Sequence, residues 1–367
     1  MNAKTVGILG LVVVAAALFI WMSQNDVETN QAGEVLLSGL AQELDDVSEL
    51  ALANAAGDTV TIEQTNGQWT VREKSRFYAN SKMVGNLLVA AADATVSEAK
   101  TSNPELYDQI GVQDLSQDDS RAVKLSITAP SKTYELLIGN QSGRFGGSTF
   151  VRRAGEAESF LVTPMLSAEV NVPLWLQTSV LDIDAADVQS VQIQATNGEV
   201  VTISKSARGD AFVLDGMPEG RALSDVPVRG LGRGLTGLTF QNVTRAVAFP
   251  VNAYQRMSAV YTLFNGVVIE VILFYTEPVD SDDGPTKEPQ YWLSIGSRFD
   301  AAIATEFTPQ PSDENAQPFV LTDADLADRQ QEADDIKNRN GPWVYEITGA
   351  RFDSINRTQE SLLIAVE

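Results

Sequence analysis

The chain has 367 residues, 44% of them hydrophobic, with no cysteine, no histidine and a formal net charge of −23. This length and apolar content suffice for two domains with their own cores and argue against wholesale disorder. The charge argues against nucleic acid as a partner, because binding to phosphates needs clustered Lys and Arg. The missing His and Cys exclude Ser-His-Asp and Cys-His nucleophilic sites, zinc sites built on those ligands, and disulfide bridges.

An uninterrupted apolar segment, VGILGLVVVAAALFIWM, occupies residues 6–22, and Lys4 precedes it. A helix of this length rises about 26 Å, at the short end of what crosses a bilayer. Basic residues stay on the cytoplasmic side, and no further Lys or Arg occurs before Arg72. The sequence therefore predicts a single-pass membrane protein with residues 1–5 in the cytoplasm, an anchor at 6–22 and an ectodomain on the opposite side of the membrane.

A cleaved signal peptide is the alternative interpretation of this segment. Residues 6–14 would form its hydrophobic part, and the three alanines at 15–17 its cleavage motif. Cleavage there would leave LFIWM as an apolar N-terminus in water, whereas Trp21 suits a membrane–water interface. We therefore favour the uncleaved anchor, followed by an acidic spacer at residues 23–44.

The first half of the ectodomain alternates between strand and helix patterns. Residues 46–52 and 59–63 alternate apolar and polar side chains about a turn at Gly57, which predicts a β-hairpin, and 68–71 supply a third strand. Apolar residues at helical spacing then predict a helix around 83–91. Further strands are expected at 122–128, 133–138, 149–153 and 159–163, with a closing helix around 166–181.

The same order of patterns recurs in the second half. A hairpin is predicted at 187–193 and 200–204 about Asn197-Gly198, followed by a strand at 211–214 and a helix at 228–238. The later elements are strands at 259–264, 267–275, 290–295 and 344–348, and a closing helix at 351–364. The predicted fold is α+β, with two related, duplicated units at 45–184 and 185–367 and mainly antiparallel sheets.

Two smaller expectations concern helix starts and insertions. Ser81 and Asp225 are candidate N-caps of the two helices. The second unit carries insertions at 276–290 and 297–342. The longer insertion contains a polar helix candidate at 323–338, which is either a solvated surface helix or a docking helix for another subunit.

One segment matches a dinucleotide-binding motif by letters alone. Residues 232–237 read G-R-G-L-T-G, but the motif needs a strand before it and a helix after it. Here it falls inside the helical pattern at 228–238, and the acidic residue expected about 20 positions later is replaced by Met257. We therefore interpret these glycines as sites of close helix packing.

Two loops and two pairs of neighbouring acidic residues also contain side chains that can bind ligands. The Gly-rich loop at 139–147 leads into a strand, so it lacks the helix N-terminus that binds phosphates, although arginines at 144, 152 and 153 could contact a ligand. The acidic turn at 280–284 lacks the ligand pattern of a calcium loop. The carboxylates at 118–119 and 334–335 are sequence neighbours and point in different directions. We therefore assign no catalytic, cofactor-binding or metal-ligating residue.

Several structural motifs lie along the chain after the N-terminal membrane segment. They are Asp46-Val47, Trp69, LIGNQ at 137–141, GGSTFVR at 146–152, FLV at 160–162, Trp175-Leu176, VLDI at 180–183 and WVYEI at 343–347. Together they resemble the bacterial domain-of-unknown-function family numbered 4340. Members of that family are similar to proteins often encoded beside ABC-type export systems related to gliding-motility auxiliary components. The resemblance implies an accessory, membrane-anchored periplasmic subunit and supplies no catalytic residue.

The leading hypothesis is thus a non-enzymatic, cofactor-free membrane protein that acts as an accessory or scaffold component of an ABC-type transport system. One alternative is a module that binds an envelope polysaccharide or other ligand through exposed aromatic rings such as Trp69, Trp175 or Trp292. The other is a glycan hydrolase using carboxylates alone, which requires two carboxyl groups about 5–10 Å apart across a cleft.

Overall fold

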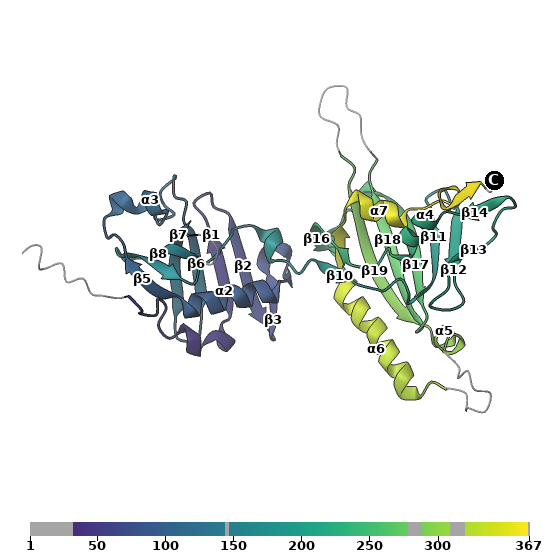
Figure 1. Ribbon diagram of the computed structural model, residues 1–367, viewed down its shortest axis with the longest axis horizontal. Helices are drawn as coiled ribbons and strands as arrows, with labels where there is room; N and C mark the ends of the chain where they lie inside the picture. Colours follow the sequence, from purple (N-terminus) through teal and green to yellow (C-terminus); the bar gives the residue numbers. More distant parts are fainter. Residues whose placement is uncertain (1–31, 144–146, 278–287, 309–319, 366–367) are drawn as a thin grey trace, which may run out of the picture. The chain divides into compact units, whose positions relative to one another are not determined.

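The computed structural model describes residues 32–143, 147–277, 288–308 and 320–365 (Figure 1). The predicted cytoplasmic residues 1–5 and anchor 6–22 lie outside these ranges. Among the described residues, no helix is long and apolar enough to cross a membrane. The chain is rich in strands, its sheets are antiparallel and its helices are few.

Two compact units divide the chain, and their limits differ from the predicted ones. Among the described residues, the first unit comprises those of 32–67 and 82–171, and the second comprises those of 68–81 and 172–365. The hairpin of β3 (Gln68–Val71) and β4 (Phe77–Tyr78) therefore groups with the second unit, although it precedes most of the first unit in sequence.

The sheet of the first unit carries its strands in the order β2-β1-β6-β7-β8-β9-β5, and all neighbours are antiparallel. Leu50 of β1 faces Ile62 of β2 on one side and Ile127 of β6 on the other, and all three side chains are fully buried. The bounds are β1 Glu49–Ala53, β2 Thr59–Thr65, β5 Thr95–Ala99, β6 Val123–Thr128, β7 Thr133–Ser142, β8 Ser148–Arg153 and β9 Ser159–Thr163.

The helix α2 (Ser81–Asp93) lies across one face of this sheet (Figure 1). Its buried residues recur at helical spacing, so one stripe faces the strands: Val84, Leu87, Leu88, Ala91 and Ala92. A short helix, α3 (Tyr107–Ile110), follows β5.

The described part of the predicted spacer belongs to the first unit. Leu36, Leu37 and Leu40 are at most 5% exposed, and Arg153 Nε donates a hydrogen bond to the Leu36 carbonyl at 3.1 Å. Val35 also forms an isolated bridge with Thr95 of β5. These apolar side chains are buried because they complete the core, so residues 32–44 are part of the fold and not a solvated linker.

The sheet of the second unit has the strand order β13-β12-β11-β17-β18-β19-β20-β16, again antiparallel throughout. The bounds are β11 Val188–Gln194, β12 Val200–Ser204, β13 Val213–Leu214, β16 Asn242–Arg245, β17 Gln255–Leu263, β18 Val267–Tyr275, β19 Tyr291–Phe299 and β20 Trp343–Glu346. Two small pairs accompany it: β10 (Ser179–Leu181) with β15 (Leu238–Thr239), and β14 (Arg221–Leu223) with β21 (Leu363–Ala365).

Four helices lie in the described part of the second unit: α4 (Asp225–Gly232), α5 (Ala301–Glu306), α6 (Asp323–Asn340) and α7 (Gly349–Ile355). The helix α6 lies along β19 (Figure 1) and covers the polar helix predicted at 323–338. A capping box between Thr322 and Asp325 starts it, and Ala333 and Asn340 are buried. The helix therefore packs one narrow stripe on the sheet and leaves its other faces in solvent.

Several predicted elements differ from the observed ones. The expected helix at 166–181 is a short 3-10 turn at Val172–Trp175 followed by β10, and Pro173 within it limits continuous helix. The expected helix at 351–364 ends at Ile355, because the later residues pair with β14 as β21. Asp225 is the first residue of α4, whose N-cap is Ser224, and Ser81 is the first residue of α2, so neither predicted N-cap is in the N-cap position. The insertion expected from 297 begins after β19 ends at Phe299.

Candidate functional site

The G-R-G-L-T-G segment at 232–237 follows a helix instead of preceding one. The helix α4 ends at Gly232, so the segment lies at the helix C-terminus. Arg351 of α7 donates hydrogen bonds to four carbonyl oxygens there, those of Arg233, Gly234 and Thr236 at 3.1 Å and that of Gly237 at 3.2 Å. A dinucleotide site needs N–H groups directed at phosphates. This turn directs carbonyl oxygens at the Arg351 guanidinium. It therefore joins α4 to α7 and offers no N–H groups to a phosphate.

Two of these glycines permit close contacts with aromatic rings. A Cβ on Gly232 would lie 2.7 Å from Phe212 Cε2, and one on Gly234 would lie 2.1 Å from Tyr261 Oη. The Tyr261 hydroxyl donates to the Leu231 carbonyl at 3.2 Å, and complete burial raises the pKa of this phenol. The interpretation of the glycines as packing sites is thus confirmed at both positions.

Replacing Gly234 with alanine should lower the free energy of unfolding by about 2–4 kcal/mol, because the new methyl group overlaps a fixed phenol. Urea unfolding followed by circular dichroism measures this change. The matched control is Gly230→Ala on α4, where a Cβ meets nothing within 4 Å and should stabilise by up to about 1 kcal/mol. Equal effects of the two substitutions would contradict the packing account.

The arginines of the Gly-rich region serve the fold of the first unit. Arg144 lies outside the described residues. Arg152 is 3% exposed, and it donates from Nε to the Val112 carbonyl at 3.0 Å and from Nη1 to the Glu156 carbonyl at 2.8 Å. Arg153 donates to the Leu36 carbonyl and to Glu156. Both guanidinium groups thus bind to main-chain carbonyls of the first unit.

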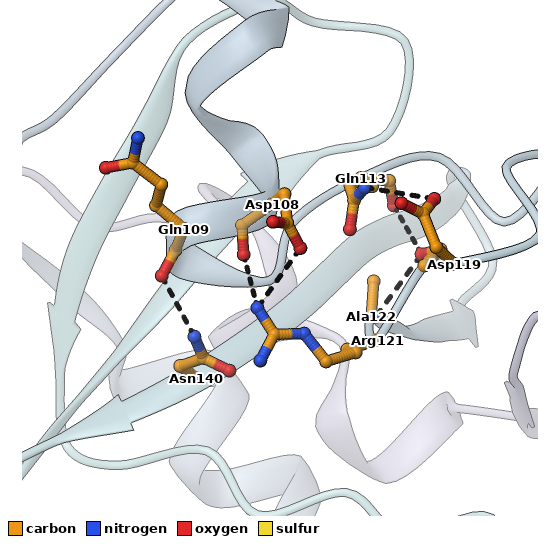
Figure 2. A network of polar contacts seen from close by, with 8 residues as sticks. Asp108, Gln109, Gln113, Asp119, Arg121, Ala122 and Asn140 are labelled. Atoms are coloured by element: carbon orange, nitrogen blue, oxygen red, sulfur yellow. Dashed lines mark hydrogen bonds and ion pairs between the residues drawn. The ribbon is translucent and has the colours of Figure 1, made fainter.

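A polar network ties down the loop between α3 and β6, as Figure 2 shows. Arg121 donates to the carbonyl oxygen of Asp108 at 2.5 Å and to its carboxylate at 3.2 Å. Gln113 donates to the Asp119 carboxylate at 3.3 Å, and Asn140 donates to the Gln109 carbonyl at 3.2 Å. The acidic pair at 118–119 therefore includes a carboxylate held by an amide, as expected for a structural role.

The tryptophans named as possible ligand-binding rings are buried. Trp69 is 9% exposed, Trp175 is 0% exposed and Trp292 is 8% exposed. Trp292 packs with Phe249 at a ring-centroid distance of 5.4 Å inside an aromatic cluster. None of the three presents a ring face on which a sugar could stack.

A pocket of about 470 Å³ lies between α4 and the loop that follows β12. The Phe212 ring and the bare Cα of Gly232 form part of its wall, and Arg229 and Arg233 of the α4 region also line it. The remaining lining residues are Ala185, Ala186, Lys205, Gly209, Asp210, Ala211, Leu223, Asp225 and Val228. Its volume falls within the range of small-molecule sites.

Lys205 is the one strongly buried ionisable group of this pocket, at 5% exposure. Its Nζ donates to the carbonyls of Ala185 at 2.9 Å, Ala186 at 3.1 Å and Arg208 at 3.4 Å, and lies 4.9 Å from the Phe212 ring centroid. Burial lowers the pKa of Lys205, while nearby aspartates oppose that change. All three ammonium protons are used in bonds to the main chain, so this lysine joins two loops and is not a free nucleophile.

Replacing Lys205 with methionine should reduce the free energy of unfolding by about 1–3 kcal/mol, because the carbonyls lose a charged donor. Thermal or urea unfolding measures the loss. Lys82→Met, on an exposed position of α2, is the control and should change stability by less than about 0.5 kcal/mol. If Lys205→Met were as stable as this control, the prediction would be wrong, because water would then replace the three hydrogen bonds without a loss of free energy of unfolding.

Sequence reasoning missed Lys205 and Arg351 because neither belongs to a motif. Their roles depend on carbonyl oxygens from distant segments, which no local pattern reveals. Within the residues that the structure describes, no group of three or more acidic side chains could hold a metal ion. The acidic turn at 280–284 lies outside those residues.

Comparison with protein families gives a match. The model of a family described as "Domain of unknown function (DUF4340)" matches residues 69–255, about half of the chain. The matched segment runs from β3 to the start of β17, and it includes Arg152, Lys205 and the α4 turn. No curated protein and no solved structure matches the chain.

Proposed function

The chain belongs to the DUF4340 family of unknown function, and we propose that it is a non-enzymatic, single-pass inner-membrane protein. Its periplasmic part would serve as an accessory or scaffold component of an ABC-type transport system. The observation that carries this proposal is the apolar segment at 6–22, preceded by Lys4 and followed by a long acidic ectodomain.

The chemistry of the basic residues supports a scaffold. Arg152 and Lys205 are buried, and Arg351 donates to four main-chain carbonyls. Such cations rigidify loops by satisfying carbonyl oxygens of the main chain. Rigid loops on a strand-rich framework suit a protein that holds a partner in place.

We also propose that the two units arose by duplication. The strand order β2-β1-β6-β7-β8-β9 in the first sheet corresponds to β12-β11-β17-β18-β19-β20 in the second. The hairpin registers agree as well: Leu52 faces Val60 in the first unit, and Ile193 faces Val201 in the second. A duplicated framework would offer related surfaces to two parts of a membrane complex.

Affinity purification of the tagged full chain from native membranes tests the proposed partnership. Under mild detergent, a permease and an ATPase should be recovered with it and identified by mass spectrometry. A chain whose residues 1–22 are replaced by a cleavable signal peptide is the matched control and should recover much less of both. Recovery of no transporter component by the anchored chain would contradict the proposal.

A further inference from the structure

A second pocket in the second unit has a lining of unusual composition. It has a volume of about 440 Å³ and is lined by Gln68, Tyr78, Gln177, Asp335, Asn338 and Arg339, which we call the polar groove. Every one of these side chains carries a hydrogen-bonding group, and Tyr78 alone adds an aromatic ring. The volume is that of a small-molecule site.

The fold holds the Tyr78 side of the polar groove in place. Tyr78 lies on β4, where it faces Thr70 of β3, and its carbonyl accepts a hydrogen bond from the Gln177 main-chain N–H at 3.0 Å. The neighbouring Phe77 packs edge-on against Trp343 and Phe240, with ring centroids 4.9 Å and 5.2 Å away. This aromatic packing fixes the hairpin without using the groups that line the groove.

The other side of the polar groove is one face of α6. Asp335, Asn338 and Arg339 are three and four residues apart, so their side chains project from the same face of the helix. The helix is fixed nearby through Asn340, which is 1% exposed and accepts a hydrogen bond from the Tyr345 hydroxyl at 2.9 Å. The three groove residues are therefore presented on a rigid element.

The protein itself uses little of the hydrogen-bonding capacity in the groove, where most of the lining side chains are exposed to solvent. Within the described chain, the Tyr78 hydroxyl and the side-chain amides of Gln177 and Asn338 have no hydrogen-bond partner. Asp335 accepts one bond, from Gln331 at 2.7 Å, and Arg339 donates one long bond to the Ser179 carbonyl at 3.4 Å. A carboxylate and a guanidinium each have further sites to offer.

The charges and hydrogen-bonding groups of the polar groove indicate which class of ligand it can bind. The charges of Asp335 and Arg339 are opposite and sum to zero, so the groove has no net charge that would attract an anion or a cation. Planar amide, carboxylate and guanidinium groups bind adjacent hydroxyls in pairs, and an aromatic ring can pack on the C–H face of a sugar. A peptide would find no apolar pocket for its side chains here. We propose that the polar groove binds a neutral carbohydrate, which differs from the earlier alternative because no tryptophan is involved.

Isothermal titration of the full chain in lipid nanodiscs tests this proposal, since nanodiscs avoid sugar-based detergents. The probes are the hexamers of glucose and of N-acetylglucosamine, with a galacturonate oligomer as an acidic comparison. At least one neutral hexamer should bind and saturate. Asn338→Ala should then weaken binding about tenfold and Tyr78→Phe severalfold, as expected for the loss of one hydrogen-bonding group each.

The matched control is Gln330→Ala, which removes an amide from a different face of α6. It should bind the hexamers as the unchanged chain does, and circular dichroism should show all variants folded. Binding of neither neutral hexamer, preference for the galacturonate oligomer, or equal affinity of Asn338→Ala and the unchanged chain would overturn the proposal. The titration needs no transporter, so its outcome is independent of the partnership proposed above.

Discussion

An Arg351→Met variant should lose about 2–4 kcal/mol of the free energy of unfolding, because four carbonyl oxygens of the turn after α4 lose their charged donor together. Arg351→Lys should recover only part of this loss, since one ammonium cannot reach oxygens that the two guanidinium nitrogens share. Urea unfolding followed by the fluorescence of the tryptophans measures both changes.

The control for this prediction is an arginine of the same unit in an exposed ion pair. Arg298 lies 3.4 Å from Glu270 and 3.5 Å from Asp300, and its side chain is 53% exposed. Its replacement by methionine should cost less than about 1 kcal/mol. If Arg351→Met and Arg298→Met were equally stable, the guanidinium of Arg351 would not hold the turn.

Replacing Arg152 with methionine should destabilise the first unit by about 3–5 kcal/mol. The guanidinium is almost completely buried, donates to the carbonyls of Val112 and Glu156, and lies 4.5 Å from the Tyr107 ring centroid. Its Nη2 also lies 2.8 Å from the carboxylate oxygen Oδ1 of Asp114. This contact is an ion pair whose angles do not meet those of a hydrogen bond. Methionine fills much of the volume but leaves two carbonyls unpaired inside the fold.

Arg121 provides the comparison within the first unit. Its side chain is 58% exposed and pairs with Asp108 at the surface, as Figure 2 shows. Arg121→Met should cost about 1 kcal/mol or less. Hydrogen exchange would locate the effect: Arg152→Met should speed exchange in the loop before β6 and in β8, whereas Arg121→Met should leave β8 protected. Equal protection of β8 in both variants would contradict the role given to Arg152.

The strands with clear alternation could be predicted from the sequence. The strand expected at 267–275 coincides with β18, and the hairpin expected at 187–204 is β11 and β12. Short strands such as β16 and β21 could not be predicted, because each is formed only by pairing with a distant segment. The strand β16 pairs with β20, and β21 pairs with β14. Strand pairing also shortened the closing helix expected at 351–364, which ends at Ile355 before β21 pairs with β14.

The candidate sites were less predictable from the sequence than the strands. The sequence showed that residues 232–237 do not bind a nucleotide, because the preceding strand and the later acidic residue are missing. It did not show the contact of this segment with Arg351, because the two segments are far apart in sequence. The polar groove likewise combines β4 with α6, and each side chain in it looks like an ordinary surface residue in its local sequence. Such sites are properties of the tertiary fold, so local patterns carry no signal for them.

Membrane topology of the full chain tests the central claim most directly. The account predicts that the chain remains in the membrane fraction after extraction with alkaline carbonate. It also predicts that protease added to the periplasmic side digests residues 23–367, while a tag placed before Met1 is cut only after the membrane is opened. Release of the chain by carbonate, or protection of the ectodomain from periplasmic protease, would contradict the account.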